Sequence, residues 1–339
     1  MDIDLDTFLT AVYTMIDDLY QEQFAAQKPS RPGQPPTVSD SEVLTLAVLE
    51  QWFGRKGEER FLQHVRREWR AYFPRTLSQS AFNRRRRDLG PVLAALGPAL
   101  AERIEAVGGE TSVYEVVACV PVPLMRRCRG RRHKLFAGTA AFGRGGSDGD
   151  WYYGVHLHLA VRPSGAISGW NTAPADTGER WQLEALVRWR TDPTLPVPTA
   201  DQLAPVLGPT HLAGGQRQGP TGQLGPRAGA GAPAPGPYLG DLGYTGTAWA
   251  AHWQSAYGAT VLTKKGLPEA LVRPFCAARQ IVETVNGWLT EHVGLAFPRA
   301  RTTPGLWARL GAKIAALNCA VWLNHLFPRP SFSFVGPFG

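Results

Sequence analysis

The sequence of 339 residues predicts an α/β protein, in which a mixed sheet flanked by helices follows an all-α N-terminal module. Two observations support this prediction. Apolar residues recur at helical spacing through the first hundred residues. From residue 112 onwards, β-branched segments come first in succession and then alternate with helical segments. Three leading strands can form an antiparallel meander, whereas strands separated by helices imply parallel crossovers.

The N-terminal module, residues 1–108, is predicted to be helical. Its helical segments are 1–26, a helix that opens at Ser39, 58–72 and 78–106. Ser39 and Glu42 have the spacing of a capping box, in which each side chain bonds the other residue's backbone amide. A proline-rich joint, KPSRPGQPPT, separates the first two helices. The first hundred residues are therefore predicted to form an all-α module.

The α/β part begins after Gly108–Gly109. The predicted strands are 112–122, 151–162, 165–171, a short strand ending at 238–241, and 259–263. The predicted helices are one capped by Asp176 and Glu179 that runs to Arg190, then 245–257, 275–293 and 304–326. Nearly half of residues 205–237 are Gly or Pro, which indicates a flexible linker or insertion. That segment divides the α/β part into 109–204 and 238–327, followed by a tail, 328–339.

The charge of the chain indicates its partner. Lys and Arg total 36 against 28 Asp and Glu, a net charge of +8, and such an excess favours a polyanion, most simply nucleic acid. No apolar run is long enough for a membrane span, and the acidic N-terminus MDIDLDTFLT lacks the pattern of a signal peptide. The four cysteines are scattered, which fits a reducing cytosol.

Two acidic residues occupy positions suited to metal chemistry. Asp241, in GDLGY, ends a short apolar strand, where open α/β sheets gather their sites. Glu283, in RQIVETVNGW, lies on the polar stripe of an amphipathic helix with Arg279. Each has an ordinary interpretation alone: Asp241 as a turn residue, Glu283 as the partner of Arg279 in a surface ion pair. Together they suit a two-metal nuclease-like site, because hard divalent cations prefer oxygen ligands.

The segments VYEVVACVPVPL, RRHKLFAG, WYYGVHLHLAV, GDLGYTG and RQIVETVNGWLTEHVGLAFPRART occur in this order. They resemble the DDE transposases of bacterial insertion sequences over about residues 112–325. The resemblance implies a ribonuclease-H-like fold for the catalytic domain and a DNA-binding and dimerising role for the helical module. It also implies that Asp241 is the second catalytic acid and Glu283 the third. Both would hold Mg²⁺, for which Mn²⁺ can substitute.

The resemblance implies a first acid in the first strand, at the position of Ala118. Alanine cannot ligate a metal, so the chain as it stands is predicted to be inactive or severely impaired. Three explanations are open: a deliberate substitution that traps a DNA complex, natural decay, or a different register. The first is favoured because the other parts of the site are intact. Glu115 is no substitute, since an offset of three residues on a strand points it to the opposite face.

The function implied by the resemblance is DNA transposition, and the implied location is the bacterial cytoplasm, in association with the nucleoid. Metal-bound water nicks the 3′ end of the transposon, and the new 3′-hydroxyl then attacks target DNA. The partners are transposon-end DNA, target DNA and a second copy of the chain, because two ends must be brought together. Two alternatives remain open: a structure-specific metal-dependent nuclease that cuts without joining, and a transposase-derived DNA-binding protein without catalysis.

Basic residues near these motifs are predicted to contact DNA phosphates. They are Arg84, Arg85, Arg86, Arg87, Arg126, Arg127, Arg131, Arg132, Lys134, Lys264, Lys265, Arg279, Arg299 and Arg301. The run Arg84–Arg87 cannot face one way on a helix, so one or two of its members are expected to reach DNA. His156 and His158 share a strand face, for which a polar sheet surface is favoured over a metal pair.

Overall fold

The computed structural model describes residues 3–27, 36–53, 57–109, 111–126, 130, 135–145, 149–196, 198, 200–207, 236–327 and 329. The N-terminal helices are α1 (Leu5–Gln23), α2 (Asp40–Phe53), α3 (Glu58–Glu68), α4 (Gln79–Asp88) and α5 (Gly90–Gly108). The predicted capping box is confirmed: the Glu42 amide donates to Ser39 Oγ at 3.1 Å, and the Ser39 amide donates to Glu42 Oε2 at 2.6 Å. The predicted helix 78–106 is interrupted at Leu89, where a proline begins the next helix.

The strands are β1 (Glu115–Arg126), β2 (Ala141–Gly145), β3 (Asp150–Val161), β4 (Ile167–Pro174), β5 (Tyr238–Leu239) and β6 (Val261–Leu262). They form one mixed sheet in the order β2-β3-β1-β5-β6, with β4 also paired to β3. β1, β3 and β4 form the expected antiparallel meander, whereas β5 is parallel to β1 and β6 is parallel to β5. The predicted mixed sheet is therefore confirmed, and β2 is an addition to it.

The remaining helices are α7 (Glu179–Thr191), α8 (Ala200–Leu207), α10 (Thr247–Tyr257), α11 (Glu269–Glu291) and α12 (Thr303–Leu326). α11 begins six residues before the predicted start at 275 and contains Pro274. α10 ends as predicted at Gly258, whose φ of 66° is the left-handed conformation that glycine adopts readily. Of the predicted linker, residues 205–207 are helical, and 208–235 lie outside the described residues.

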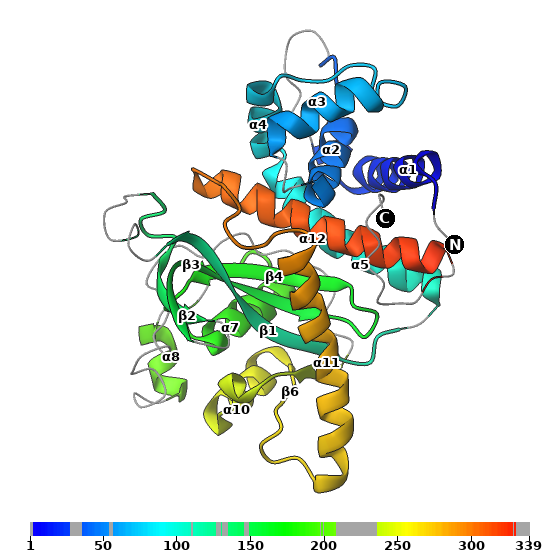
Figure 1. Cartoon of the computed structure of the whole chain (residues 1–339). Coiled ribbons are helices and arrows are strands. Elements are labelled where there is room, and N and C mark those ends of the chain that lie inside the picture. Colours follow the sequence, from blue (N-terminus) through cyan, green and yellow to red (C-terminus); the bar gives the residue numbers. More distant parts are fainter. Residues whose placement is uncertain are drawn as a thin grey trace.

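Helices cover both faces of the sheet (Figure 1). α5, α11 and α12 pack on one face, and α7 and α10 lie on the other, where Val117 of β1 contacts an aromatic-rich cluster. None of the helices in the described part of the chain is long and apolar enough to cross a membrane.

The C-terminal helix α12 joins the N-terminal module to the sheet. Its Gly311 lies against the backbone of α5, and Gly97 of α5 lies against Ile314, so that a side chain at either glycine would overlap its neighbour. Asn318 of α12 donates hydrogen bonds to the carbonyls of Gly97 at 2.7 Å and Ile167 at 2.9 Å. The predicted division at residue 108 thus separates two segments of sequence whose apolar side chains share one core.

Candidate functional site

Asp241 follows the carboxyl end of β5, a central strand of the sheet. The Gly240 amide still bonds the Leu262 carbonyl of β6, and the chain then turns through Leu242–Tyr244. Asp241 Oδ1 accepts a hydrogen bond from the Gly243 amide at 2.7 Å. The ordinary interpretation of Asp241 as a turn-capping residue is therefore correct for its Oδ1 atom. The other carboxylate oxygen, Oδ2, does not take part in this turn and can contribute to a site at the strand end.

The register of β1 and β5 brings Ala118 to the level of Asp241. Val116 lies opposite Leu239 in this parallel pair, and Ala118 and Asp241 each follow two residues further along. Neighbouring strands run about 4.8 Å apart. The ladder itself ends at Val116 and Leu239, so the common level of Ala118 and Asp241 follows from extending its register. The Ala118 side chain is buried, with 7% of its surface exposed. The predicted adjacency of the first strand and the Asp241 strand is confirmed.

A second acid that the sequence analysis missed approaches Asp241. Glu179 was expected to cap α7, but the N-cap residue is Gly178 and no side chain caps the helix, so that prediction is wrong. The Glu179 carboxylate instead lies over Gly243: a Cβ at Gly243 would stand 1.7 Å from Glu179 Oε2. Burial, followed by the negative charge of Asp241, raises the pKa of Glu179 to about 8, although Arg279 and Arg180 oppose the shift. Burial and the neighbouring Asp241 therefore favour the protonated form of the Glu179 carboxyl.

Replacing Glu179 with glutamine should flatten the pH dependence of stability. Because the pKa of Glu179 is higher in the folded protein than its ordinary value of 4.5, its contribution to stability is full below about pH 4.5 and is lost as the pH rises through about 8. Thermal unfolding should therefore show Glu179→Gln to be more stable than the native chain at pH 8. The exposed Glu269→Gln is the matched control. Identical pH profiles for native and Glu179→Gln proteins would contradict the buried pairing.

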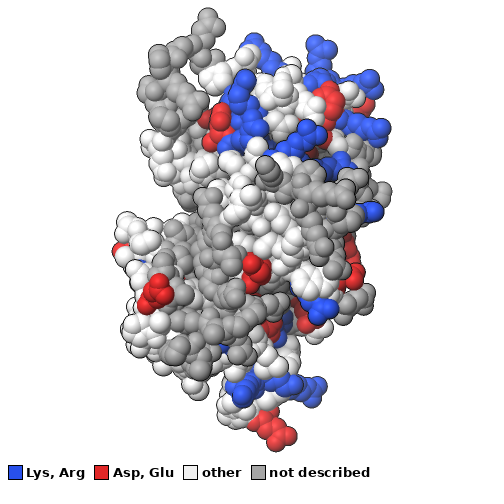
Figure 2. All heavy atoms as spheres, turned by 90° about the vertical axis from the view of Figure 1, so that its left-hand side faces the viewer, with Lys and Arg blue, Asp and Glu red and all other residues white. Residues whose placement is uncertain are grey.

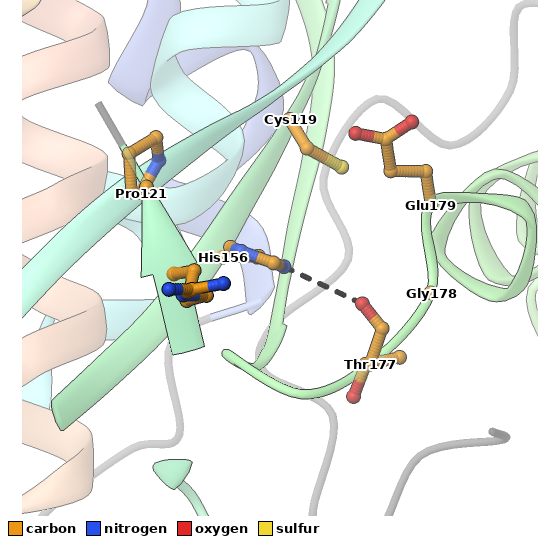
Figure 3. Close-up of a pocket in the computed structure, with 8 residues that line it drawn as sticks. Cys119, Pro121, His156, Thr177, Gly178 and Glu179 are labelled. Atoms are coloured by element: carbon orange, nitrogen blue, oxygen red, sulfur yellow. Dashed lines mark hydrogen bonds between the residues drawn. The ribbon is translucent and has the colours of Figure 1, made fainter. Parts of the chain in front are cut away.

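A small cavity of about 200 Å³ lies beside this acid pair. It is lined by Cys119, Pro121, Arg144, Gly145, His156, Thr177, Gly178 and Glu179. Cys119 of β1 and Glu179 of α7 extend toward each other across it (Figure 3). Burial raises the pKa of the Cys119 thiol well above its usual range, so the thiol is protonated and a poor nucleophile.

The two histidines of β3 are buried beneath this region. His156 Nδ1 lies 3.4 Å from the Thr177 carbonyl, and His158 lies near the Tyr244 ring, with the ring centroids 5.9 Å apart. Burial lowers the pKa of His158 to about 3, which keeps its ring neutral. No set of three His, Cys, Asp or Glu residues in the described part of the chain gathers as a metal site. The two rings belong to the sheet face and its packing.

Glu283 and Arg279 lie on α11, which packs against β1. Within the described residues the two side chains form no ion pair, so the alternative of a surface Arg–Glu bridge is not realised. Arg279 instead lies near enough to Glu179 for its charge to lower the pKa of that acid. Glu283 is exposed one helical turn further along the same stripe. The structure thus brings Arg279 to the acid pair and leaves Glu283 facing solvent.

As the chain stands, these residues do not fit a pair of Mg²⁺ ions. Ala118 has no ligating atom. Glu283 makes no contact with Asp241 among the interactions of the described residues. β1 therefore contributes no oxygen ligand at the level of Asp241.

The run Arg84–Arg87 divides into structural and exposed residues. Arg86 is buried, with 1% of its surface exposed, and its guanidinium lies 2.5 Å from Glu50 and 2.7 Å from Glu58. The prediction that Arg86 contacts DNA is therefore wrong, because its charge is neutralised in the interior. Arg85 is half-buried and pairs with Asp40. Arg84 and Arg87 are exposed and remain available to a partner.

The other predicted DNA contacts lie at several places on the surface. Arg126 is exposed at the end of β1, and Lys264 and Lys265 are exposed after β6. Arg299 and Arg301 are exposed on the loop between α11 and α12. Arg127, Arg131, Arg132 and Lys134 lie outside the described residues. Figure 2 shows that Lys and Arg side chains gather over the upper part of the molecule, which the N-terminal helices form.

Comparisons of the chain with protein-family models, with curated proteins and with solved structures each found no match. The fold and site thus define a mixed α/β protein with a strand-end acid pair and a basic surface. The resemblance to DDE transposases rests on the sequence motifs alone.

Proposed function

We propose that this chain is a DNA-binding protein built as a DDE transposase, in which alanine at position 118 silences metal-dependent DNA cleavage and strand transfer. One observation carries the proposal: the parallel register of β1 and β5, extended by two residues, puts Ala118 at the level of Asp241, and the resemblance implies the first two acids at these positions. An antiparallel meander followed by two parallel strands also supports a ribonuclease-H-like domain. The packing of α11 on β1 brings the Glu283 helix to the same strand.

The chemistry of the site supports the silencing. A two-metal site needs several carboxylates, because each ion is held by oxygen ligands and two ions share them. Here burial and the negative charge of Asp241 raise the pKa of Glu179, and the charge of Arg279 opposes that shift. When bound, divalent ions would supply an activated water and charge stabilisation for phosphoryl transfer. Without a carboxylate at position 118, the chain does not complete the two-metal site. Its basic residues still bind DNA and neutralise the phosphate charge.

The distribution of basic side chains supports DNA as the partner. β6 is parallel to β5, so their carboxyl ends meet at the same edge of the sheet. Lys264 and Lys265 follow β6, which sets two exposed cations at the edge where Asp241 follows β5. Exposed lysines at this edge can contact the phosphates that flank a scissile bond.

The test uses the Ala118→Asp protein, Mg²⁺, duplex DNA from the sequence that flanks its gene, and a supercoiled plasmid as target. Joined products on a gel support the transposase assignment, whereas cut products without joining support the nuclease. If the folded variant binds the duplex and neither cuts nor joins it, the second candidate is correct: a DNA-binding protein without catalysis, which Ala118 itself favours. Failure of the native chain to bind any duplex overturns the proposal.

A further inference from the structure

A large groove lies between the N-terminal module and the loop that joins α11 to α12. Its volume is about 1030 Å³. One wall comes from the first turns of α3 and α4, and the other from residues 290–302 and the start of α12. These segments are more than two hundred residues apart in sequence, so only the folded chain assembles the groove.

Four arginines that line the groove are exposed and form no ion pair with any described residue. They are Arg60, Arg87, Arg299 and Arg301. The acidic side chains of the same walls are already engaged: Glu50 and Glu58 pair with the buried Arg86, and Glu59 pairs with Arg66. Glu291 also has a partner of its own. The groove therefore presents uncompensated positive charge.

The arginine-bearing loop is fixed in an unusual backbone conformation. Phe297 and Arg299 have φ values of 53° and 55°, which non-glycine residues rarely adopt. The Phe297 amide donates to the Pro123 carbonyl of β1 at 2.8 Å, which ties the loop to the sheet. Across the groove, the Arg299 guanidinium lies beside Gly57 at the start of α3. Residues in such rare backbone conformations persist only where the surrounding structure holds them, and they cluster at functional sites.

Features of both walls of the groove also favour an anion. The side-chain stem of Arg87 lies along Gly305 in the first turn of α12. The first turns of α3, α4 and α12 all border the groove, and the positive ends of their dipoles add to the arginine charge. Phosphate oxygens accept from arginine in a paired geometry. Spaced arginines along a groove suit a row of phosphates better than a single small anion.

We infer that this groove holds the phosphate backbone of one duplex DNA, gripped between the helical module and the α11–α12 loop. The inference rests on the proposed function and assigns a specific surface to its DNA. Pro123 lies five residues beyond Ala118 on β1, about 16 Å along a strand. That separation is less than one duplex turn of about 34 Å, so one duplex can reach both the groove and the Asp241 site.

The test measures binding of the full chain to a blunt duplex of arbitrary sequence by fluorescence anisotropy at several salt concentrations. The triple variant Arg87→Gln, Arg299→Gln, Arg301→Gln should lower the slope of log affinity against log salt by roughly one for each arginine. At about 0.1 M salt this corresponds to roughly tenfold weaker binding per contact. Arg301→Lys should keep most of the slope, because it keeps the charge. Arg103→Gln, which removes one charge that pairs with Glu22 elsewhere, is the control.

The outcomes separate the groove from the proposed function. If native protein binds duplex and the triple variant binds with the same slope, the groove assignment is overturned while DNA binding stands. If native protein binds single strands alone, and the triple variant weakens that binding, the duplex is the wrong occupant. Absence of any binding by folded native protein overturns both. Thermal unfolding of each variant checks its fold, and the exposed positions should leave the melting temperature unchanged.

Discussion

The Ala118→Asp protein is expected to nick duplex DNA in Mg²⁺ at a rate at least about a thousandfold above that of the native chain. A metal-bound nucleophile and metal charge stabilisation supply several kcal/mol of barrier lowering, and each 1.36 kcal/mol is about tenfold in rate. The aspartate adds the missing carboxylate beside Asp241 at the level set by the β1–β5 register. Gel analysis of a supercoiled plasmid measures the nicking.

The same variant carries its own controls. Asp241→Asn or Glu283→Gln in the Ala118→Asp background should abolish nicking, because each removes an implied ligand. Ala118 is 7% exposed, so an aspartate there buries a charge and should lower the melting temperature without metal. Mg²⁺ should restore that loss through binding to the folded state. A folded, DNA-binding Ala118→Asp protein that does not nick in Mg²⁺ would contradict the catalytic assignment.

Replacing Arg86 with glutamine is expected to destabilise the fold by about 3–5 kcal/mol. The change leaves Glu50 and Glu58 buried, with Arg309 near Glu58 but no cation in the place of Arg86. The neighbouring Arg84→Gln should change stability by less than about 0.5 kcal/mol, because Arg84 is exposed. Urea unfolding of the two variants measures the difference.

Adding Glu50→Gln and Glu58→Gln to Arg86→Gln should recover part of the lost stability, since the two buried carboxylates are then neutral. The recovery is partial because Arg309 loses its Glu58 partner. Equal stability of the Arg84→Gln and Arg86→Gln proteins would show that the buried ion pair does not stabilise the folded chain. Weaker DNA binding by a stable Arg86→Gln protein would instead return Arg86 to the DNA surface.

The sequence predicted the positions of helices and strands better than the tertiary contacts between them. Long amphipathic helices and alternating strands follow from local periodicity, so α12 and β3 appear nearly where expected. β2 was missed because its sequence, AFGRG, is short and glycine-rich. Hydrogen-bonded pairing with β3, which local sequence does not reveal, makes this segment a strand. α8 lies at the edge of a Gly- and Pro-rich segment whose composition predicts a linker. In both cases tertiary contacts decide what local pattern leaves open.

In the candidate site, too, the sequence located individual residues but not the contacts between them. Asp241 at a strand end and Ala118 in the first strand could be located from motifs, but the approach of Glu179 needed the fold, because α7 and Gly243 lie far apart in sequence. A signal for Arg86 was present: Phe82 is four residues earlier, so the two share a helix face, and both are buried. The periodicity of α4 therefore distinguishes Arg86 from the exposed Arg84 and Arg87.

The most direct test of the central claim is the affinity of the protein for Mn²⁺, measured by calorimetric titration without DNA. If Ala118 stands where the first acid of a shared metal site belongs, Ala118→Asp should bind Mn²⁺ at least about tenfold more tightly than the native chain, since a carboxylate adds an oxygen ligand to Asp241. Asp241→Asn should cancel that gain in the double variant. Equal Mn²⁺ affinity for the native and Ala118→Asp proteins, or a gain that survives Asp241→Asn, would contradict the claim.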